Sequence, residues 1–377
     1  MIKERLYFVD WLRVIVILTL IPYHCALTYT GLGVVYIISP IRDMVILPLL
    51  IITASLDNFF MTLLFFLSGI GTYYSLQHRS GSEYMRERAN KLIWPFLIGW
   101  VFICPLQAYF KGLYHGFSGS FLSFIPEFFS NMDYYIGYAH LWFLLYLFTF
   151  SAICAPLFYR WLKDNNRLNR VTSFLCKGYN IFIPMAFIIL VETFLRPVFV
   201  GRPYIIFMDW ANDLVYLSVF VFGFIFAYDS KIQARIYELT RISTVIALIC
   251  IPILTYLYYQ WAVWGAQAVL LTYTWAFIKG VYECSAIIML VGIGKKYLNK
   301  KTNVIIYLNK ASFTYYYWHY LPLSALTYYL IRTNLNVYLK YSLVVILSYL
   351  FILALYELVV NRLFGRLNKR SAKQLST

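Results

Sequence analysis

Residues 13 to 24 read RVIVILTLIPYH, an apolar run with an arginine at one end and a histidine at the other. On an α-helix this spacing amounts to about three turns, so Arg13 and His24 lie on one stripe, about 16 Å apart. Asp10 lies one turn before Arg13 on the same face and can compensate its charge. Arg13 can therefore lie near an interface, where it could hold an anionic group or position His24.

His24 lies well along the same run, directly after Pro22 in the order IPYH. Ionisable side chains inside such segments are costly and usually face a cavity. A neutral imidazole can accept a hydroxyl proton near pH 7, which suits it to acyl or group transfer. The alternative is an imidazole that only bonds a neighbouring helix and packs. We predict the catalytic role, with Asp10, Arg13 and His24 as the catalytic residues.

The composition indicates a membrane protein. Of the 377 residues, 62% are hydrophobic and 13% charged, whereas soluble domains are about 45–50% apolar and about 25% charged. Apolar segments recur without a long polar insert, so we predict a single all-α domain over residues 1–377. The net charge of +16 would suggest nucleic acid for a soluble protein. Because the basic residues cluster in alternate loops, as cytoplasmic loops do, we expect membrane lipids and no nucleic acid as partners.

A membrane-spanning helix needs about 20 mostly apolar residues. The apolar stretch 43–54 is too short to span, contains Pro48 and runs into Asp57. We therefore predict an interfacial or re-entrant piece there. Longer apolar segments that can span occur at 12–30, 56–76, 92–110, 139–159, 180–197, 212–228, 243–261, 267–291, 311–331 and 341–361. The sequence therefore predicts a polytopic helix bundle with about ten transmembrane helices.

The basic residues decide its orientation. With the N-terminus inside, the cytoplasmic segments contain most of the Lys and Arg residues. The opposite side receives Arg42, Lys111, Arg196, Arg202, Arg332 and Lys340. This asymmetry predicts that both termini are cytoplasmic, with a cytoplasmic tail from about residue 362, in a multi-pass protein of the cytoplasmic membrane.

Other polar residues in the predicted helices are candidate substrate ligands. His140 and Trp142 begin the fourth span on the outer side, where they could hydrogen-bond and stack on a sugar or serve as interface anchors. His319 is flanked by aromatic residues, so helix packing is its alternative role. Lys279 and Glu283 are spaced i, i+4 in the eighth span and can neutralise each other, which predicts a polar cavity beside them.

The stretch RLYFVDWLRVIVILTLIPYH resembles the opening of the acyltransferase 3 family of membrane O-acyltransferases, in which ten residues separate an Arg and a His in the first helix. In RANKLIWP, which resembles the family's basic pair before a proline, Lys91 replaces the second Arg, and lysine cannot form the forked hydrogen bonds of arginine. Further segments in the family's order are NFFMTLLFFLSG (58–69), RANKLIWP (88–95), AHLWFLLYL (139–147) and YYYWHYLPL (315–323).

The resemblance implies transfer of an acyl group from cytoplasmic acyl-CoA, a donor substrate and not a resident cofactor, to a hydroxyl of an extracytoplasmic glycan. His24 would activate that hydroxyl or assist passage of the acyl group. Arg88 and Lys91 would meet polyanionic CoA, unless they only follow the positive-inside rule. Ser68 is a further substrate-binding candidate. Acetyl and succinyl donors are both compatible, and the DWLR and HLWFL segments are most similar to members that succinylate periplasmic glucans.

Two alternatives belong to other classes. A proton-coupled secondary transporter would also use intramembrane ionisable groups, but the sequence shows no clear inverted repeat or paired broken helices. A different membrane acyltransferase family would carry its critical histidine in a later span, such as His319. We find no hydrolase, metalloprotease or nucleotide-binding motif, and no spacing that predicts a metal site.

Overall fold

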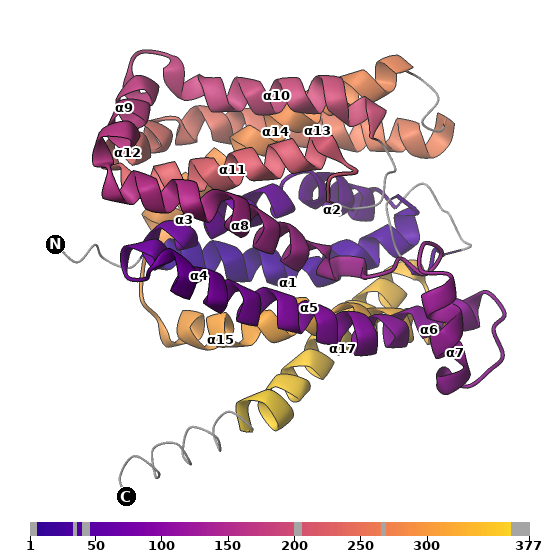
Figure 1. Ribbon diagram of the computed structural model, residues 1–377. Helices are drawn as coiled ribbons and strands as arrows, with labels where there is room; N and C mark the ends of the chain where they lie inside the picture. Colours follow the sequence, from indigo (N-terminus) through magenta and orange to yellow (C-terminus); the bar gives the residue numbers. More distant parts are fainter. Residues whose placement is uncertain (1–5, 33–35, 40–45, 200–205, 265–268, 363–377) are drawn as a thin grey trace, which may run out of the picture.

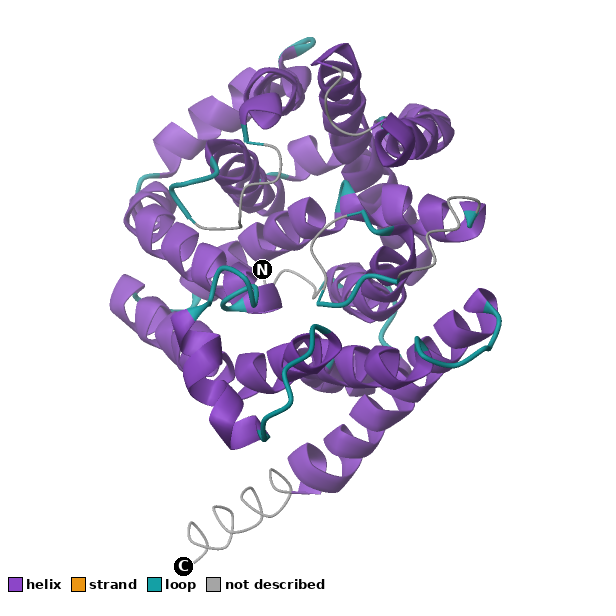
Figure 2. Ribbon diagram, turned by 90° about the vertical axis from the view of Figure 1, so that its right-hand side faces the viewer, coloured by secondary structure: helices purple, strands orange, loops and turns teal. Residues whose placement is uncertain are grey.

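The computed structural model describes residues 6–32, 36–39, 46–199, 206–264 and 269–362, which contain helices joined by loops and no strand (Figure 1, Figure 2). The predicted all-α class is confirmed. The helices are α1 (Tyr7–Thr30), α2 (Leu47–Asp57), α3 (Phe60–Gln77), α4 (Gly81–Arg88), η1 (Ala89–Ile93), α5 (Trp94–Ile98), η2 (Gly99–Ile103), α6 (Cys104–Tyr114), α7 (Phe121–Ser130), η3 (Ala139–Leu141), α8 (Trp142–Lys163), α9 (Asn165–Cys176), η4 (Asn180–Phe182), α10 (Ile183–Leu195), η5 (Arg196–Val198), α11 (Trp210–Tyr228), α12 (Ser230–Glu238), α13 (Thr240–Trp264), α14 (Val269–Ile293), η6 (Gly294–Leu298), α15 (Asn303–Trp318), α16 (Tyr320–Leu330), α17 (Val337–Leu355) and η7 (Tyr356–Asn361).

Nine helical stretches of the described residues are long and apolar enough to cross a membrane. They correspond to nine of the ten predicted spans. The other, 311–331, forms α15 and α16, which are separated at His319. Pro322 explains the interruption, because proline lacks the N–H that would bond the carbonyl of Trp318 and its ring crowds that carbonyl.

The structure differs from the prediction at the stretch 43–54. From Leu47 onward this stretch belongs to α2, and α3 begins two residues after α2 ends. Residues 47–77 together therefore have the length of a full span. We predicted a separate interfacial or re-entrant piece because Pro48 and Asp57 interrupt the apolar run. Pro48 is tolerated in the first turn of α2, where its missing N–H has no intrahelical partner.

The stretch Gly81–Tyr114 is one continuous helix of mixed geometry that extends the predicted span 92–110 in both directions. Two π-helical segments, η1 and η2, each end two residues before a proline, Pro95 and Pro105. A proline inside an α-helix crowds the carbonyl four residues earlier. The wider π turns fall at these positions, where they accommodate the prolines without breaking the helix.

Two glycines bring α3 and α11 into backbone contact. A Cβ atom on Gly69 would lie 2.0 Å from the carbonyl oxygen of Phe220, and one on Gly223 would lie 2.1 Å from that of Phe66. No larger residue fits at either position without moving a helix. Gly69 ends the FFLSG segment, so this part of the motif fixes the packing of two helices that enclose the cavity described below.

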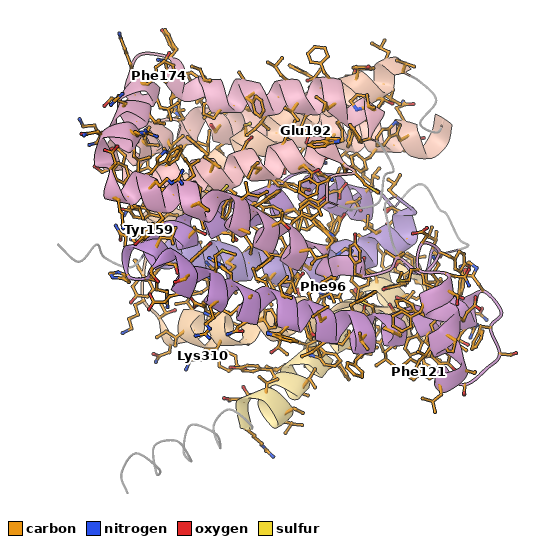
Figure 3. All side chains as sticks on the ribbon, viewed as in Figure 1. Phe96, Phe121, Tyr159, Phe174, Glu192 and Lys310 are labelled. Carbon is orange, nitrogen blue, oxygen red and sulfur yellow. The ribbon has the colours of Figure 1, made fainter. Side chains whose placement is uncertain are left out.

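The helix ends form two sides. In Figure 1, α1 begins and α17 ends toward the side that carries α4, α9 and α12. Figure 3 shows the labelled side chains of Tyr159 and Phe174 at this end and Phe121 at the other. The helices α4, α9 and α12 carry basic residues of the predicted cytoplasmic loops. The terminal and loop residues Lys3, Arg5, Arg42 and Arg202, and the predicted tail beyond Arg362, lie outside the described residues.

Candidate active site

A cavity of about 280 Å³ lies among α1, α3, α8, α11, α13, α14 and the interruption between α15 and α16. Six of the predicted site residues line it: His24, His140, Trp142, Lys279, Glu283 and His319. They come from four segments that are far apart in the sequence. The predicted polar cavity beside Lys279 and Glu283 and the cavity at His24 are therefore one space.

His24 enters this cavity from α1 as a half-buried side chain. Its Nδ1 lies 2.8 Å from the hydroxyl oxygen of Tyr320, the first residue of α16. When Nδ1 carries the proton and donates to Tyr320, the Nε2 atom is the basic nitrogen. The imidazole is thus oriented by a residue that lies 296 positions away in the sequence, which is the arrangement expected of a general base.

Two further imidazoles surround His24. The ring of His319 is stacked on that of His24 with 5.3 Å between centroids, and the ring of His140 lies 4.6 Å from that of His319. The carbonyl oxygens of Tyr316 and Tyr317, beside the helix interruption, lie 2.7 Å from His319 Nδ1 and 3.2 Å from His140 Nε2. A carbonyl can only accept, so these two nitrogens carry protons and donate to the backbone.

The tautomers of both residues are therefore fixed, with His319 Nε2 and His140 Nδ1 as the unprotonated nitrogens of the neutral rings. Both atoms are buried and have no hydrogen-bond partner among the described residues. Although three imidazoles meet here, no three His, Cys, Asp or Glu side chains in the described ranges are placed so that they could hold a metal ion.

A carboxyl group also lines the cavity. Asp57, at the end of α2, accepts a hydrogen bond from Tyr23, the residue before His24, and another of 2.6 Å from the hydroxyl of Tyr258 on α13. All three residues line the cavity. Asp57 therefore contributes to the cavity lining a carboxyl group that two tyrosine hydroxyls hold in place.

An ionic network forms the opposite wall. The guanidinium of Arg196 donates two hydrogen bonds of 2.9 Å to the carboxylate of Glu192, one turn earlier, and one of 2.8 Å to Asn212. Asp209 lies 3.4 Å away on the other side of the guanidinium. In Figure 3, Glu192 lies on α10 within the bundle. Arg196 is therefore buried with its charge compensated twice.

Lys279 extends this network from α14. Its Nζ lies 2.8 Å from Glu192 and 2.7 Å from Glu283, whose Oε1 also accepts a hydrogen bond of 2.9 Å from Thr62. The predicted ion pair between Lys279 and Glu283 is thus present. Glu192 is a second partner of Lys279, which the helical spacing did not indicate. Buried ion pairs of this kind require such full compensation.

Aromatic rings supply the remaining walls. Trp261 and Trp275 lie with ring centroids 4.6 Å apart, and Trp142 stacks on Tyr216 at 5.9 Å. All four line the cavity. Flat apolar rings beside polar groups are suited to an organic ligand that carries both apolar faces and hydroxyl groups.

Comparison with known proteins gives one match. A family model described as an acyltransferase domain, of the acyltransferase 3 type, matches residues 6–357. The chain belongs to the acyltransferase 3 family. No curated protein and no solved structure matches it significantly. The resemblance predicted from the motifs is confirmed at the level of the family, and this acyltransferase 3 protein is a membrane acyltransferase rather than a transporter.

Five predicted site residues lie apart from the cavity of this acyltransferase 3 protein. On α1, Arg13 forms an ion pair of 3.4 Å with Asp10, which Asn309 also contacts at 3.4 Å. Neither Arg13 nor Asp10 lines the cavity that holds His24. On α3, the hydroxyl of Ser68 donates to the carbonyl of Leu64. The shared stripe predicted on the first helix therefore does not place Arg13 and His24 in one pocket.

The other two residues lie at the end that is predicted to be cytoplasmic. Arg88 lies 5.0 Å from the centre of the Tyr84 ring and 3.4 Å from the hydroxyl of Thr72. Lys91 is exposed and forms an ion pair of 2.5 Å with Glu87, one turn away. Both residues carry charges that a ligand from the cytoplasm could reach, because they lie at the side that the basic loops predict to be cytoplasmic.

Several lining residues were not predicted. Asp57, Asp209 and Tyr258 lie near the ends of predicted helices, where polar residues are ordinary. Tyr320 lies inside the predicted span 311–331, and Arg196 was assigned to the outer loops. One signal could have identified the pair of Glu192 and Arg196. Arg196 follows Glu192 by four positions inside an apolar segment, a spacing that places opposite charges together on one helix face.

Proposed function

We propose that this protein is an integral-membrane O-acyltransferase that transfers an acyl group from cytoplasmic acyl-CoA to a hydroxyl of an extracytoplasmic glycan. The observation that carries the proposal is His24, which lines a cavity of the helix bundle and has its Nδ1 within hydrogen-bond distance of the Tyr320 hydroxyl. Family membership supplies the reaction class.

In the proposed reaction His24 acts as the general base. Its Nε2 takes the proton of the acceptor hydroxyl, and the oxygen attacks the carbonyl carbon of the thioester. The new C–O bond forms as the C–S bond breaks, and the imidazolium returns the proton to the departing thiolate. Tyr320 orients the imidazole, and accepts the hydrogen bond of the Nδ1 proton in the tautomer in which Nε2 is basic.

The donor is proposed to enter from the cytoplasmic side. Arg88, Lys91 and Arg13 lie in that half, and their positive charges suit the phosphates of CoA. Ser68 lies on α3 four residues before Thr72, the hydroxyl that Arg88 contacts. The acceptor is proposed to occupy the cavity, which Trp142 and His140 line.

Acetyl and succinyl groups are both candidates for transfer. The DWLR and HLWFL segments are most similar to those of glucan biosynthesis protein C, a succinyltransferase for periplasmic glucans, which favours a succinyl group and a glucan acceptor. The cytoplasmic, or inner, membrane is the proposed location, because acyl-CoA is cytoplasmic and the basic loops require that orientation.

The test is replacement of His24 by alanine. His24→Ala is expected to lower O-acylation of envelope glycans by about 10³-fold, because it removes the base. The protein should still reach the membrane, since the substitution lowers the polarity of a membrane helix. The readout is mass spectrometry of glycans from cells that contain only the variant.

His78→Ala is the matched control, since His78 is exposed at the end of α3 and does not line the cavity. It should leave ester levels unchanged. Retained acylation in His24→Ala, with equal amounts of protein in the membrane, would show that another group is the base.

A further inference from the structure

Glu283 is anchored by only one of its two carboxyl oxygens. Its Oε1 accepts a hydrogen bond of 2.9 Å from the hydroxyl of Thr62 and lies 2.7 Å from Nζ of Lys279. Its Oε2 is buried and has no hydrogen-bond partner in the part of the chain that the structure describes. The residue lines the cavity, so this wall of the site contains a carboxyl oxygen that lacks a donor.

Glu192, the other carboxylate beside Lys279, has no such atom. Each of its oxygens accepts a hydrogen bond of 2.9 Å from Arg196, and Oε1 also lies 2.8 Å from Nζ of Lys279. It is also absent from the described residues that line the cavity. Buried acceptors are costly unless a donor reaches them. Of these two carboxylates, Glu283 is therefore the one that can receive a donor from a ligand in the cavity.

The packing of α1 against α14 and η6 places Glu283 at the depth of His24. A Cβ atom on Gly294 would lie 3.3 Å from the side chain of Leu12, which fixes the register of these antiparallel helices near their predicted cytoplasmic ends. From that contact, His24 lies 12 positions along α1 and Glu283 lies 11 positions back along the other helix. At about 1.5 Å per residue, the two residues lie at nearly the same height.

A second contact agrees with this register. The ring centroid of Phe60 lies 4.9 Å from that of Tyr23, the residue before His24. Thr62 lies two positions after Phe60 on α3 and donates to Glu283. The proposed base and the unpartnered carboxyl oxygen therefore share one level of the cavity, where a single ligand can reach both.

A hydroxyl group is the kind of donor that this arrangement suits. A carboxylate oxygen only accepts hydrogen bonds, whereas a hydroxyl can donate one. An acceptor substrate with several hydroxyl groups can give the proton of one of them to His24 and donate a hydrogen bond from another to Glu283.

We infer that Oε2 of Glu283 binds a second hydroxyl of the acceptor and thereby determines which hydroxyl meets His24. The inference rests on the proposed function and names its acceptor class, molecules with at least two hydroxyl groups of which one is acylated. A site built to hydrogen-bond a substrate hydroxyl discriminates strongly against a substrate, or a binding orientation, that cannot supply it. Acylation should therefore occur at one hydroxyl position.

The first experiment determines the ester position by NMR on envelope glycans from cells with and without the gene. The expected result is an ester that depends on the gene and occupies one hydroxyl position of the acceptor sugar. Gene-dependent esters spread over several hydroxyl positions would overturn the inference while the proposed function stands. No gene-dependent ester on any envelope glycan would overturn the proposed function, and with it the inference.

Glu283→Gln tests the contact itself. Because Thr62 and Lys279 require an oxygen at the other position, the amide places an N–H group where Oε2 stood. The probe is the envelope glycan isolated from cells that lack the gene. It is given, with the acyl-CoA that carries the ester found in the first experiment, to membranes that contain the full chain. The KM for this glycan should rise about tenfold, the KM for acyl-CoA should not change, and esters should appear at further positions.

Glu192→Gln is the matched control, because it removes a carboxylate from the same Lys279 at a residue outside the described lining of the cavity. At equal amounts of protein in the membrane, it should leave the KM for the glycan and the ester position unchanged. The same rise in KM in both variants would assign the effect to the charge of the network. No rise in Glu283→Gln would mean that Oε2 binds only water, and either result would overturn the inference.

Discussion

The cavity and the cytoplasmic end handle charge in different ways. At the cavity, Lys279 is nearly buried and paired with carboxylates from two helices, α10 and α14. At the cytoplasmic end, Arg13 and Lys91 are partly or largely exposed, and each has an ion-pair partner within one turn of its own helix. The comparison indicates that the cavity holds its charged groups in fixed positions, whereas the other end has exposed charges that can change partners, as the proposed binding of polyanionic CoA requires.

The largest difference should appear in stability. Lys279→Ala leaves Glu192 and Glu283 facing each other in a buried site, so we expect it to lower the free energy of unfolding by about 3–5 kcal/mol. Lys91→Ala, the same substitution in an ion pair whose lysine side chain is 69% exposed, should cost less than about 1 kcal/mol. Unfolding of both variants in detergent micelles measures this. Equal losses would remove the distinction between the two regions.

The next effect concerns the orientation of His24. Tyr320→Phe keeps the ring but removes the hydroxyl at His24 Nδ1, so kcat should fall about tenfold while KM changes little. Tyr329→Phe, on the exposed face of the same helix, should match the unchanged protein. If Tyr320→Phe retains full kcat, the hydroxyl does not position the base.

The smallest effect should come from the cytoplasmic end. Arg88→Lys keeps the charge but loses the planar fork, so the KM for acyl-CoA should rise about fivefold with kcat unchanged. Arg86→Lys, on the exposed face of the same helix, should leave KM as it was. A fall in kcat without a change in KM would mean that Arg88 supports the structure of the transfer site instead of binding the donor.

Much of the fold and part of the site could be predicted from the sequence. Segment length and apolarity located the spans, because the bilayer imposes both. The cost of ionisable groups in apolar segments identified His24, Lys279 and Glu283, and all three line the cavity. A helical stripe could not show that Arg13 and His24 face different surroundings, because the neighbours of α1 change along its length.

Contacts between distant segments could not be predicted. Asp57 binds Tyr258 across 201 positions of sequence, and Tyr316 and Tyr317 fix two imidazoles through backbone carbonyls that have no sequence signature. The role of Gly69 also depends on a backbone that arrives from α11. Helical periodicity describes one helix at a time, so a site built between seven segments appears only when they are assembled.

The glycine contact limits how this bundle can move. With carbonyls of one helix against the Cα atoms of the other, α3 and α11 can neither slide by a turn nor roll without steric collision. They behave as a rigid wall that bears Thr62 at the cavity and Thr72 beside Arg88. In the proposed reaction, an acyl group that travels between the two faces would pass beside this fixed pair of helices.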